Sequence, residues 1–290
     1  MRKSIGVLLL VTLVVSMLTA CSGGNTSAFD DKKEIVVVSR EDGSGTRGAF
    51  IELFGIEQKN DDGTKKDLTT KEAIIAKQTD VMMTNIAGNP YSIGYISLGS
   101  LNDTVKALQI DGVTPSSANV KNGSYAIARP FTIVTKGEAT GLAKDFIDFI
   151  LSAEGQAIVG NSYIAVSENA PAYAGNKPYG KIVVAGSSSV TPIMEKLMEA
   201  YLAINTNATI EIQLSDSSAG ITSAIEGTCD IGMASRELKA SESEQLTAIQ
   251  IALDGIAVIV NHKNPATNLT KEQIKDIFTG VITKWNEVDQ

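Results

Sequence analysis

The sequence is poor in the residues that metal sites and many hydrolases need. It contains one histidine, His262, and two cysteines, Cys21 and Cys229, in 290 residues. Zinc sites usually draw several ligands from these residue types, so we expect no metal and no cofactor. A Ser-His-Asp hydrolase would depend on His262 alone, and we interpret this residue as a solvated position between polar neighbours. The composition therefore favours binding without catalysis.

Positive charge is also scarce. The chain has 25 Lys and Arg against 33 Asp and Glu, which gives a formal net charge of −8. No basic face is available to neutralise phosphates at scale, so we expect no nucleic-acid partner. An apolar fraction of 43% argues against a disordered chain, and at about 150 residues per domain the length suggests two lobes.

The N-terminal segment has the pattern of a secretory signal. Two basic residues precede an apolar run at 5–18, which falls short of the roughly 20 residues that a membrane span needs. Leu18-Thr19-Ala20-Cys21 resembles the bacterial lipobox, which implies a lipoprotein signal peptide at 1–20 and a lipid on Cys21. An ordinary signal peptide with a coincidental cysteine stays the alternative. We expect residues 21–33 to be a flexible tether at the outer face of the cell membrane.

The remainder of the chain alternates short apolar runs with helical patterns. Residues 35–38 and 182–185 are β-branched runs typical of buried parallel strands, and a Gly/Ser-rich turn and a helical period follow each. Further strands are predicted at 93–97, 105–110, 127–135, 209–213 and 255–260, and further helices at 142–159 and 271–278. This alternation predicts an α/β fold with helices on both faces of a sheet.

Four loops rich in small polar residues adjoin these elements. They span 39–46, 186–192, 216–220 and 230–236, and three of them open predicted helices. Glycine lets a backbone approach a ligand closely, and helix N-termini direct N–H groups and a positive dipole at an anion. Arg40 adds a guanidinium that suits a tetrahedral oxyanion. Helix capping explains each loop alone, but the four together favour an anion site.

The first loop also matches a dinucleotide-binding fingerprint. Residues 43–48 read G-x-G-x-x-G between a predicted strand and a predicted helix. The acidic residues about 20 positions later, Asp61 and Asp62, lie in a polar loop rather than at the end of a second strand. A nicotinamide-dependent dehydrogenase is therefore disfavoured.

Several stretches are specific enough to indicate a family. They are VVVSREDGSGTRGAF (36–50), IGYISLGSL (93–101), YAIARPFTIVTK (125–136), VVAGSSSVTPIMEKL (183–197), DSSAGITSAIEGTCDIGMASREL (216–238), LDGIAVIVN (253–261) and LTKEQIKDIFTGVITKWNEV (269–288). In these stretches the chain resembles the phosphate-binding proteins of bacterial phosphate ABC transporters. The resemblance implies a two-lobe periplasmic-binding-protein type II fold that closes by a hinge over a ligand cleft.

The order of the stretches departs from that family. There the segment that resembles 181–290 precedes the one that resembles 34–175, so the resemblance implies a circularly permuted chain. It also implies one continuous lobe at 113–261 and a discontinuous lobe formed by 34–112 plus 262–290.

The resemblance carries the phosphate contacts of the family to particular positions. They fall on Arg40, Ser44, Thr46 and the backbone of Gly45 in the first loop, on Ser189 and the backbone of Val190 in the second, and on Ser217 in the third. Asp42 is the residue implied to orient Arg40. Some family members have an Asp in the fourth loop that accepts a proton from the ligand. This chain has Ser235 there, which can donate or accept, so the inference of phosphate over sulfate is weaker.

The resulting expectation is a monomeric extracytoplasmic receptor that captures inorganic phosphate and delivers it to an ABC permease, without enzymatic activity. A receptor for sulfate or another tetrahedral oxyanion is the alternative. An extracellular phosphatase or serine hydrolase is another alternative. The sequence disfavours it, because His262 is its one candidate general base. A scaffold lipoprotein with a vestigial anion site is a further alternative.

Overall fold

The computed structural model describes residues 29–60 and 65–288. The signal peptide predicted at 1–20, Cys21 and most of the tether predicted at 21–33 lie outside the described residues. No helix in the described part is both long and apolar enough to cross a membrane.

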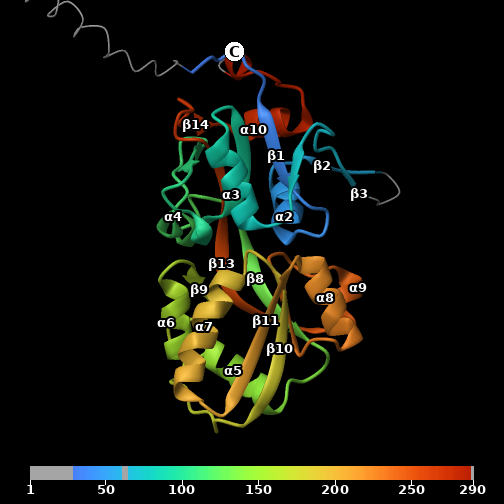
Figure 1. Cartoon of the computed structure of the whole chain (residues 1–290), viewed down its shortest axis with the longest axis vertical. Coiled ribbons are helices and arrows are strands. Elements are labelled where there is room, and N and C mark those ends of the chain that lie inside the picture. The colour runs from blue at the N-terminus through green and yellow to red at the C-terminus, as the bar shows by residue number, and fades with distance from the viewer. Residues whose placement is uncertain (1–28, 61–64, 289–290) are drawn as a thin grey trace, which may run out of the picture. The chain divides into compact units, whose positions relative to one another are not determined.

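A mixed sheet organises residues 31–288 (Figure 1). In the described ranges it has ten strands, in the order β11-β10-β12-β8-β13-β5-β1-β4, with β6 and β9 pairing with β13. These strands are β1 (Val36–Arg40), β4 (Ile74–Ala76), β5 (Ser92–Ser97), β6 (Lys106–Ala107), β8 (Ala128–Thr135), β9 (Ile164–Ala165), β10 (Gly180–Ser187), β11 (Ala208–Ser215), β12 (Ile231–Ala234) and β13 (Thr247–Val260). Two small ladders join β2 (Glu57–Lys59) to β3 (Lys65–Asp67) and β7 (Gln109–Ile110) to β14 (Asn268–Leu269).

Helices flank the sheet. They are α2 (Gly45–Leu53), α3 (Thr79–Gly88), α4 (Ser117–Lys121), α5 (Gly141–Ile150), α6 (Ala153–Gly160), α7 (Thr191–Ile204), α8 (Ser217–Glu226), α9 (Ala240–Ser243) and α10 (Lys271–Thr279). Two short 3₁₀ helices, η1 (Leu98–Ser100) and η2 (Trp285–Glu287), complete the described elements.

Two groups of parallel strands lie in this sheet. In the first, β1 pairs with β4 and β5, and we call this group with α2, α3 and α10 the β1 half. In the second, β10 pairs with β11 and β12, and we call it with α5, α6, α7 and α8 the β10 half. The predictions of an α/β fold and of parallel strands at 35–38 and 182–185 are confirmed.

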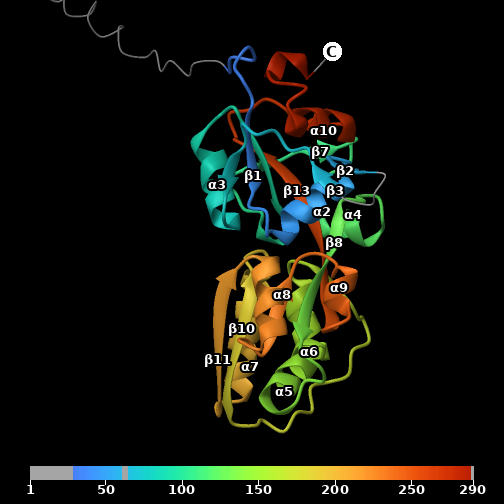
Figure 2. The same ribbon diagram turned by 90° about the vertical axis from the view of Figure 1, so that its right-hand side faces the viewer.

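Strands β8 and β13 connect the two halves (Figure 2). Residues 247–255 of β13 pair antiparallel with β8, and residues 256–260 pair antiparallel with β5. One strand therefore belongs to both halves. The sequence analysis predicted only 255–260 of this strand and missed its first part, Thr247–Asp254.

The helix predicted at 142–159 is two helices, α5 and α6. Ser152 interrupts it, because its side chain caps α6 by accepting a hydrogen bond from the N–H of Gly155 at 3.2 Å. The chain then folds back so tightly that a Cβ on Gly155 would lie 2.2 Å from the carbonyl oxygen of Phe149. The prediction of one helix was wrong because the apolar spacing continues across the break.

The first and last described segments of the β1 half lie side by side. The N–H of Ile35 donates to the carbonyl of Thr283 at 2.8 Å, and Glu34 forms a β-bridge with Lys284. Trp285 is buried beside this bridge, and its indole N–H donates to the carbonyl of Tyr91 at 3.0 Å.

A buried carboxylate anchors the long loop between β9 and β10. Asp145 on α5 accepts hydrogen bonds from the hydroxyls of Tyr173 and Tyr201, at 2.5 and 2.7 Å, and from the N–H of Asn176 at 3.1 Å. Asn205 bonds to the Tyr201 hydroxyl at 3.0 Å. The network ties the loop to α5 and α7.

We predict that Tyr201→Phe lowers the free energy of unfolding by about 1–2 kcal/mol, because Asp145 loses a donor while Asn205 loses an acceptor. Urea denaturation measures the change. Tyr179→Phe is the matched control, since the Tyr179 side chain is 88% exposed and its loss of a hydroxyl should change stability by less than about 0.5 kcal/mol. Equal effects of the two substitutions would contradict the anchoring role of Asp145.

A second buried carboxylate lies where β8 and β13 join the halves. Asp254 accepts hydrogen bonds from Arg129 at 3.2 and 3.4 Å, from the Ser97 hydroxyl at 3.0 Å and from the Gly99 N–H at 3.3 Å. Burial raises the pKa of Asp254 to about 6 although Arg129 and these donors oppose the shift, and burial also lowers the pKa of Arg129. Desolvation therefore outweighs the attraction between the two charges.

This raised pKa predicts a pH-dependent stability. The folded chain binds the Asp254 proton more tightly than the unfolded chain does, so the stabilisation is full below about pH 4 and disappears as the pH rises through about 6. We expect wild type to lose on the order of 2 kcal/mol relative to Asp254→Asn between pH 4 and 7. Urea titrations of both proteins across this range measure the difference, and a difference that is independent of pH would refute the prediction.

Candidate anion-binding site

Arg40 is the last residue of β1, and a buried tyrosine fixes this end of the strand. The N–H of Arg40 donates to the Tyr95 hydroxyl at 3.1 Å, and the Ser39 hydroxyl lies 2.8 Å from the same oxygen. The Tyr95 ring stacks on Phe50 of α2 with ring centroids 3.8 Å apart. Burial raises the pKa of Tyr95, so its hydroxyl stays protonated and holds the strand end by hydrogen bonds.

The Arg40 side chain is 2% exposed, and its immediate neighbour orients it. Nε donates to Oε2 of Glu41 at 2.8 Å, and Nη2 donates to Oε1 at 2.7 Å. Asp42, which the family resemblance implied for this role, is instead 96% exposed and pairs with Arg47 at 2.7 Å. The prediction for Asp42 was wrong, because the turn after β1 directs Glu41 toward the guanidinium and Asp42 toward solvent.

Hydroxyl groups of both halves meet around Arg40. Nη2 of Arg40 donates to the Ser188 hydroxyl at 2.9 Å, across from one half to the other. The hydroxyls of Thr46 on α2 and Ser189 before α7 lie 2.8 Å apart. The Oγ1 of Thr79, at the start of α3, lies 3.5 Å from the Ser188 hydroxyl and 3.4 Å from that of Ser189.

A second group of hydroxyls surrounds the start of α2. The Ser235 hydroxyl lies 3.0 Å from that of Ser187 and 3.3 Å from that of Ser217, whose oxygen also accepts the Ser235 N–H at 3.1 Å. A Cβ on Gly45 would lie 2.4 Å from the Ser217 oxygen and 2.8 Å from the Ser235 oxygen. Glycine is therefore required here by close approach between the two halves.

We call these groups the donor cluster, and each member is at most 6% exposed. Its members are Arg40, Ser44, Thr46, Thr79, Ser187, Ser188, Ser189, Ser217 and Ser235. The structure brings together the nominated side chains of Arg40, Thr46, Ser189, Ser217 and Ser235, with Gly45 between them. The Ser44 side chain is buried in the same loop, where it caps α2. The Val190 N–H, nominated as a backbone donor, bonds to the carbonyl of Ser187 at 3.0 Å.

Sequence reasoning missed Glu41, Thr79, Ser187 and Ser188. Three of them lie within loops that it did single out, where the choice among adjacent residues depends on backbone direction. Thr79 gave the weaker signal, a Thr-Asp pair at the start of a helical period. Such a pair usually indicates only a helix start.

Four helices begin at the donor cluster, and Thr79 is the first residue of one of them, α3. Ser44 caps α2 by accepting the N–H of Arg47 at 3.3 Å, and Asp216 caps α8 by accepting the N–H of Ala219 at 2.8 Å. Helix α7 starts directly after Ser189 and Val190, with a proline in its first turn. The N–H groups and dipoles of these helix ends favour negative charge at the cluster.

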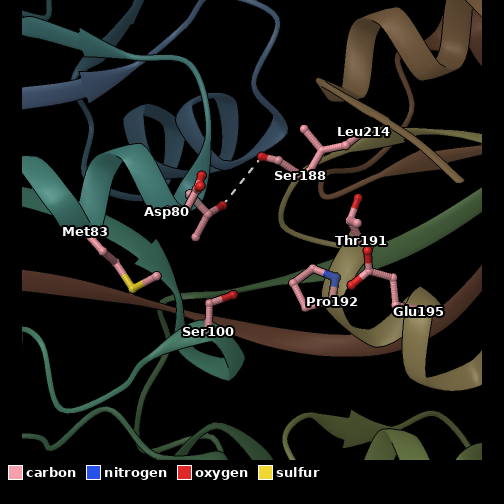
Figure 3. Close-up of a pocket in the computed structure, with 9 residues that line it drawn as sticks. Asp80, Met83, Ser100, Ser188, Thr191, Pro192, Glu195 and Leu214 are labelled. Atoms are coloured by element: carbon pink, nitrogen blue, oxygen red, sulfur yellow. Dashed lines mark hydrogen bonds between the residues drawn. The ribbon is translucent and has the colours of Figure 1, made fainter.

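Two cavities adjoin the donor cluster. One of about 300 Å³ lies between α3 and α7, and Thr79 and Ser188 line it (Figure 3). The other, of about 400 Å³, is lined by Glu41, Gly43 and Asp216 among others. The first has space beside the hydroxyls, and the second has space beside the Glu41 carboxylate.

The chain's one histidine is not part of the cluster contacts. His262 is exposed in the loop after β13, and its Nε2 lies 2.9 Å from the carbonyl oxygen of Asp103. Residues 29–60 and 65–288 contain no group of three or more His, Cys, Asp or Glu side chains arranged to hold a metal ion.

Comparison with known proteins identifies the family. The model of the PBP superfamily domain matches residues 27–154 and 171–290. The chain is 54% identical to the phosphate-binding protein PstS 2 of Streptococcus agalactiae, over 95% of this chain and 94% of that one. It is 37% identical to the phosphate-binding protein PstS of Bacillus subtilis, over 47% of this chain and 43% of that one.

A solved structure agrees with these matches. It is the crystal structure of a phosphate-binding protein of a phosphate ABC transporter from Streptococcus pneumoniae. The similarity has a TM-score of 0.71 at 47% identity and covers 88% of this chain and all of that one. The α/β sheet, the family model and these relatives together show that the chain belongs to the PBP superfamily and, within it, to the family of the phosphate-binding proteins.

Proposed function

We propose that the chain is a receptor that binds a tetrahedral oxyanion, inorganic phosphate foremost, between the β1 and β10 halves. One observation carries the proposal: buried hydroxyls from both halves and the Arg40 guanidinium converge where α2, α7 and α8 begin. The names of the relatives from Streptococcus agalactiae and Streptococcus pneumoniae support phosphate as the ligand.

Binding by the donor cluster replaces the water shell of the anion. Hydroxyls rotate to donate, and the helix ends supply N–H groups. The Nη1 edge of Arg40 is the less engaged part of the guanidinium, because its one contact in the described residues is Thr79 Oγ1 at 3.4 Å. A buried donor without an acceptor costs about 1–3 kcal/mol, so a ligand with acceptors in all directions is favoured.

Sulfate, or another tetrahedral oxyanion, is the second candidate. Ser235 favours it, because a hydroxyl at this position can donate to a ligand oxygen that carries no proton.

The proposed work is capture and delivery without chemistry. Closure of the halves buries the anion, and the closed form delivers it to the permease of an ABC transporter. The relatives are named as binding proteins, and His262 contacts a loop carbonyl rather than a serine of the cluster. We therefore propose no enzymatic activity.

The N-terminal sequence supports a place outside the cytoplasm. We propose that residues 1–20 are a lipoprotein signal peptide, that Cys21 carries a lipid, and that 21–33 tether a monomeric receptor to the outer face of the cell membrane.

The lobes at 113–261 and at 34–112 plus 262–290 also remain a proposal. The strand pairing favours lobe boundaries at two places, near 127–128, where β8 begins, and near 255–256, where β13 changes its partner from β8 to β5. A circularly permuted order is supported by the Bacillus subtilis relative, which matches less than half of each chain, while the Streptococcus agalactiae relative matches almost throughout. An alignment that keeps the order of residues can match only one of two segments whose order is exchanged.

We predict that phosphate raises the melting temperature of the soluble body, because a ligand at 100 times its Kd adds about 2.7 kcal/mol of stability.

Arg40→Lys should weaken phosphate binding at least tenfold, because lysine keeps the charge but loses the forked N–H groups. Isothermal titration calorimetry measures the phosphate affinities of wild type and of Arg40→Lys. Arg236→Lys is the control, since Arg236 pairs with Glu242. Absence of any oxyanion effect on wild type would sink the proposal.

The close approach at Gly45 gives a second prediction. Gly45→Ala should lower phosphate affinity at least tenfold, because the new Cβ would collide with the hydroxyls of Ser217 and Ser235. Gly88→Ala is the control, since no atom lies within 4 Å of its added Cβ. If calorimetry finds equal phosphate affinity for Gly45→Ala and wild type, then the halves do not approach this closely around the ligand.

A further inference from the structure

The cavity between α3 and α7 shares a wall with the donor cluster. Its volume of about 300 Å³ lies at the lower end of the range for small-molecule sites. Thr79 and Ser188 line this cavity and also belong to the cluster, so the space begins beside their hydroxyls (Figure 3). A ligand bound at the cluster therefore has room on this side for a group larger than one oxygen atom.

The shared wall is the part of the cluster with the longest contacts. The Oγ1 of Thr79 lies 3.5 Å from the Ser188 hydroxyl and 3.4 Å from that of Ser189. It also lies 3.4 Å from Nη1 of Arg40. Hydrogen bonds between hydroxyls are usually about 2.7–2.8 Å long, and the hydroxyls of Thr46 and Ser189 are 2.8 Å apart. Thr79 and Ser188 are thus only weakly held together, and a chain attached to a bound anion can separate them.

Two carboxylates line the same cavity, one from each half. Asp80 lies on the α3 side and Glu195 on the α7 side, and both residues are exposed (Figure 3). Neither carboxylate has a hydrogen-bond or ion-pair partner within residues 29–60 and 65–288. Carboxylates beside an anion site repel inorganic phosphate, so a ligand that also carries a positive charge suits this arrangement better.

The other lining groups favour a short carbon chain that ends in a hydrogen-bond donor. Met83, Pro192 and Leu214 supply apolar surface, which methylene groups can cover. The Oγ of Ser100, in η1, is buried and has no hydrogen-bond partner in the described part of the chain. The described lining contains no Lys or Arg. Its carboxylates and the Ser100 hydroxyl can accept hydrogen bonds, and a primary ammonium supplies three donors.

We propose that this cavity is a subsite for the organic part of a phosphate monoester, a short carbon chain that ends in a primary ammonium. The inference rests on the proposed function and deepens it, because the phosphoryl group binds at the donor cluster. A monoester keeps three terminal oxygens for the cluster and directs its fourth oxygen, with the chain, between Thr79 and Ser188. The methylene groups lie against the apolar lining, and the ammonium donates to Asp80 and Glu195.

The test is calorimetry of wild type with O-phosphoethanolamine, ethyl phosphate and inorganic phosphate at pH 8. Ethyl phosphate has the same ester and carbon chain as O-phosphoethanolamine but lacks the ammonium. At this pH both esters are dianions and the ammonium keeps its proton. We expect O-phosphoethanolamine to bind at least tenfold more tightly than ethyl phosphate, because two unpaired carboxylates attract the ammonium. Equal affinities of the two esters would overturn the subsite.

Variants of the carboxylates assign the effect to the cavity. Glu195→Gln should lower the ratio of O-phosphoethanolamine to ethyl phosphate affinity at least threefold, and adding Asp80→Asn should bring this ratio close to one. Glu199→Gln is the matched control, because Glu199 is exposed one turn further along α7 and is not among the residues that line the cavity. It makes the same change of charge and should leave the ratio as in wild type. An equal fall of the ratio in Glu199→Gln and Glu195→Gln would show that general charge attracts the ammonium, which would refute the subsite.

The outcomes also separate this inference from the proposed function. If wild type binds inorganic phosphate but neither ester, the subsite is wrong while the receptor function stands. If wild type binds neither inorganic phosphate nor an ester, the proposed function itself fails.

Discussion

The candidate site depends on the continuous pairing of β13 with β8 in one half and with β5 in the other. This ladder fixes where the two groups of parallel strands end. Arg40 ends β1 and Ser187 ends β10, and the loops after both strands meet in direct hydrogen bonds. Because α2 and α7 begin immediately after these loops, their N-termini come together without a long connecting segment. The sheet thus sets the site, and the small side chains permit the contact.

Sequence reasoning predicted the architecture better than the details of contact. Period and composition located β1, β5, β10 and β11, because β-branched runs between glycine-rich turns have few alternative structures, but they missed the short strands β4 and β12. The choice of Asp42 over Glu41 failed because adjacent acidic residues in a turn differ only in direction, which composition does not encode. The break at Ser152 was missed because a serine can cap a helix or lie within one. Thr79 reaches the cluster through a tertiary contact, for which its local pattern has no signal.

The electrostatics of the site are local rather than global. The chain carries a formal net charge of −8, yet surface charges are screened over about 8–10 Å in physiological salt. Within the cluster, the charge of Arg40 is balanced by Glu41, so fixed charge alone offers an anion little. In the proposed site the attraction would come instead from hydroxyl and N–H dipoles held at short range in a buried environment. Such a site recognises the arrangement of donors and acceptors on a ligand more than its charge.

The pairing of the first described segment with the last one places a fluorescent side chain in a buried position. Trp285 is the one tryptophan of the chain, and it is buried where its indole donates to Tyr91, beside the bridge between Glu34 and Lys284. Its fluorescence emission therefore reports whether the pairing between these two segments is intact. Both segments belong to the β1 half. The emission thus follows local separation of the two segments independently of any movement of one half against the other.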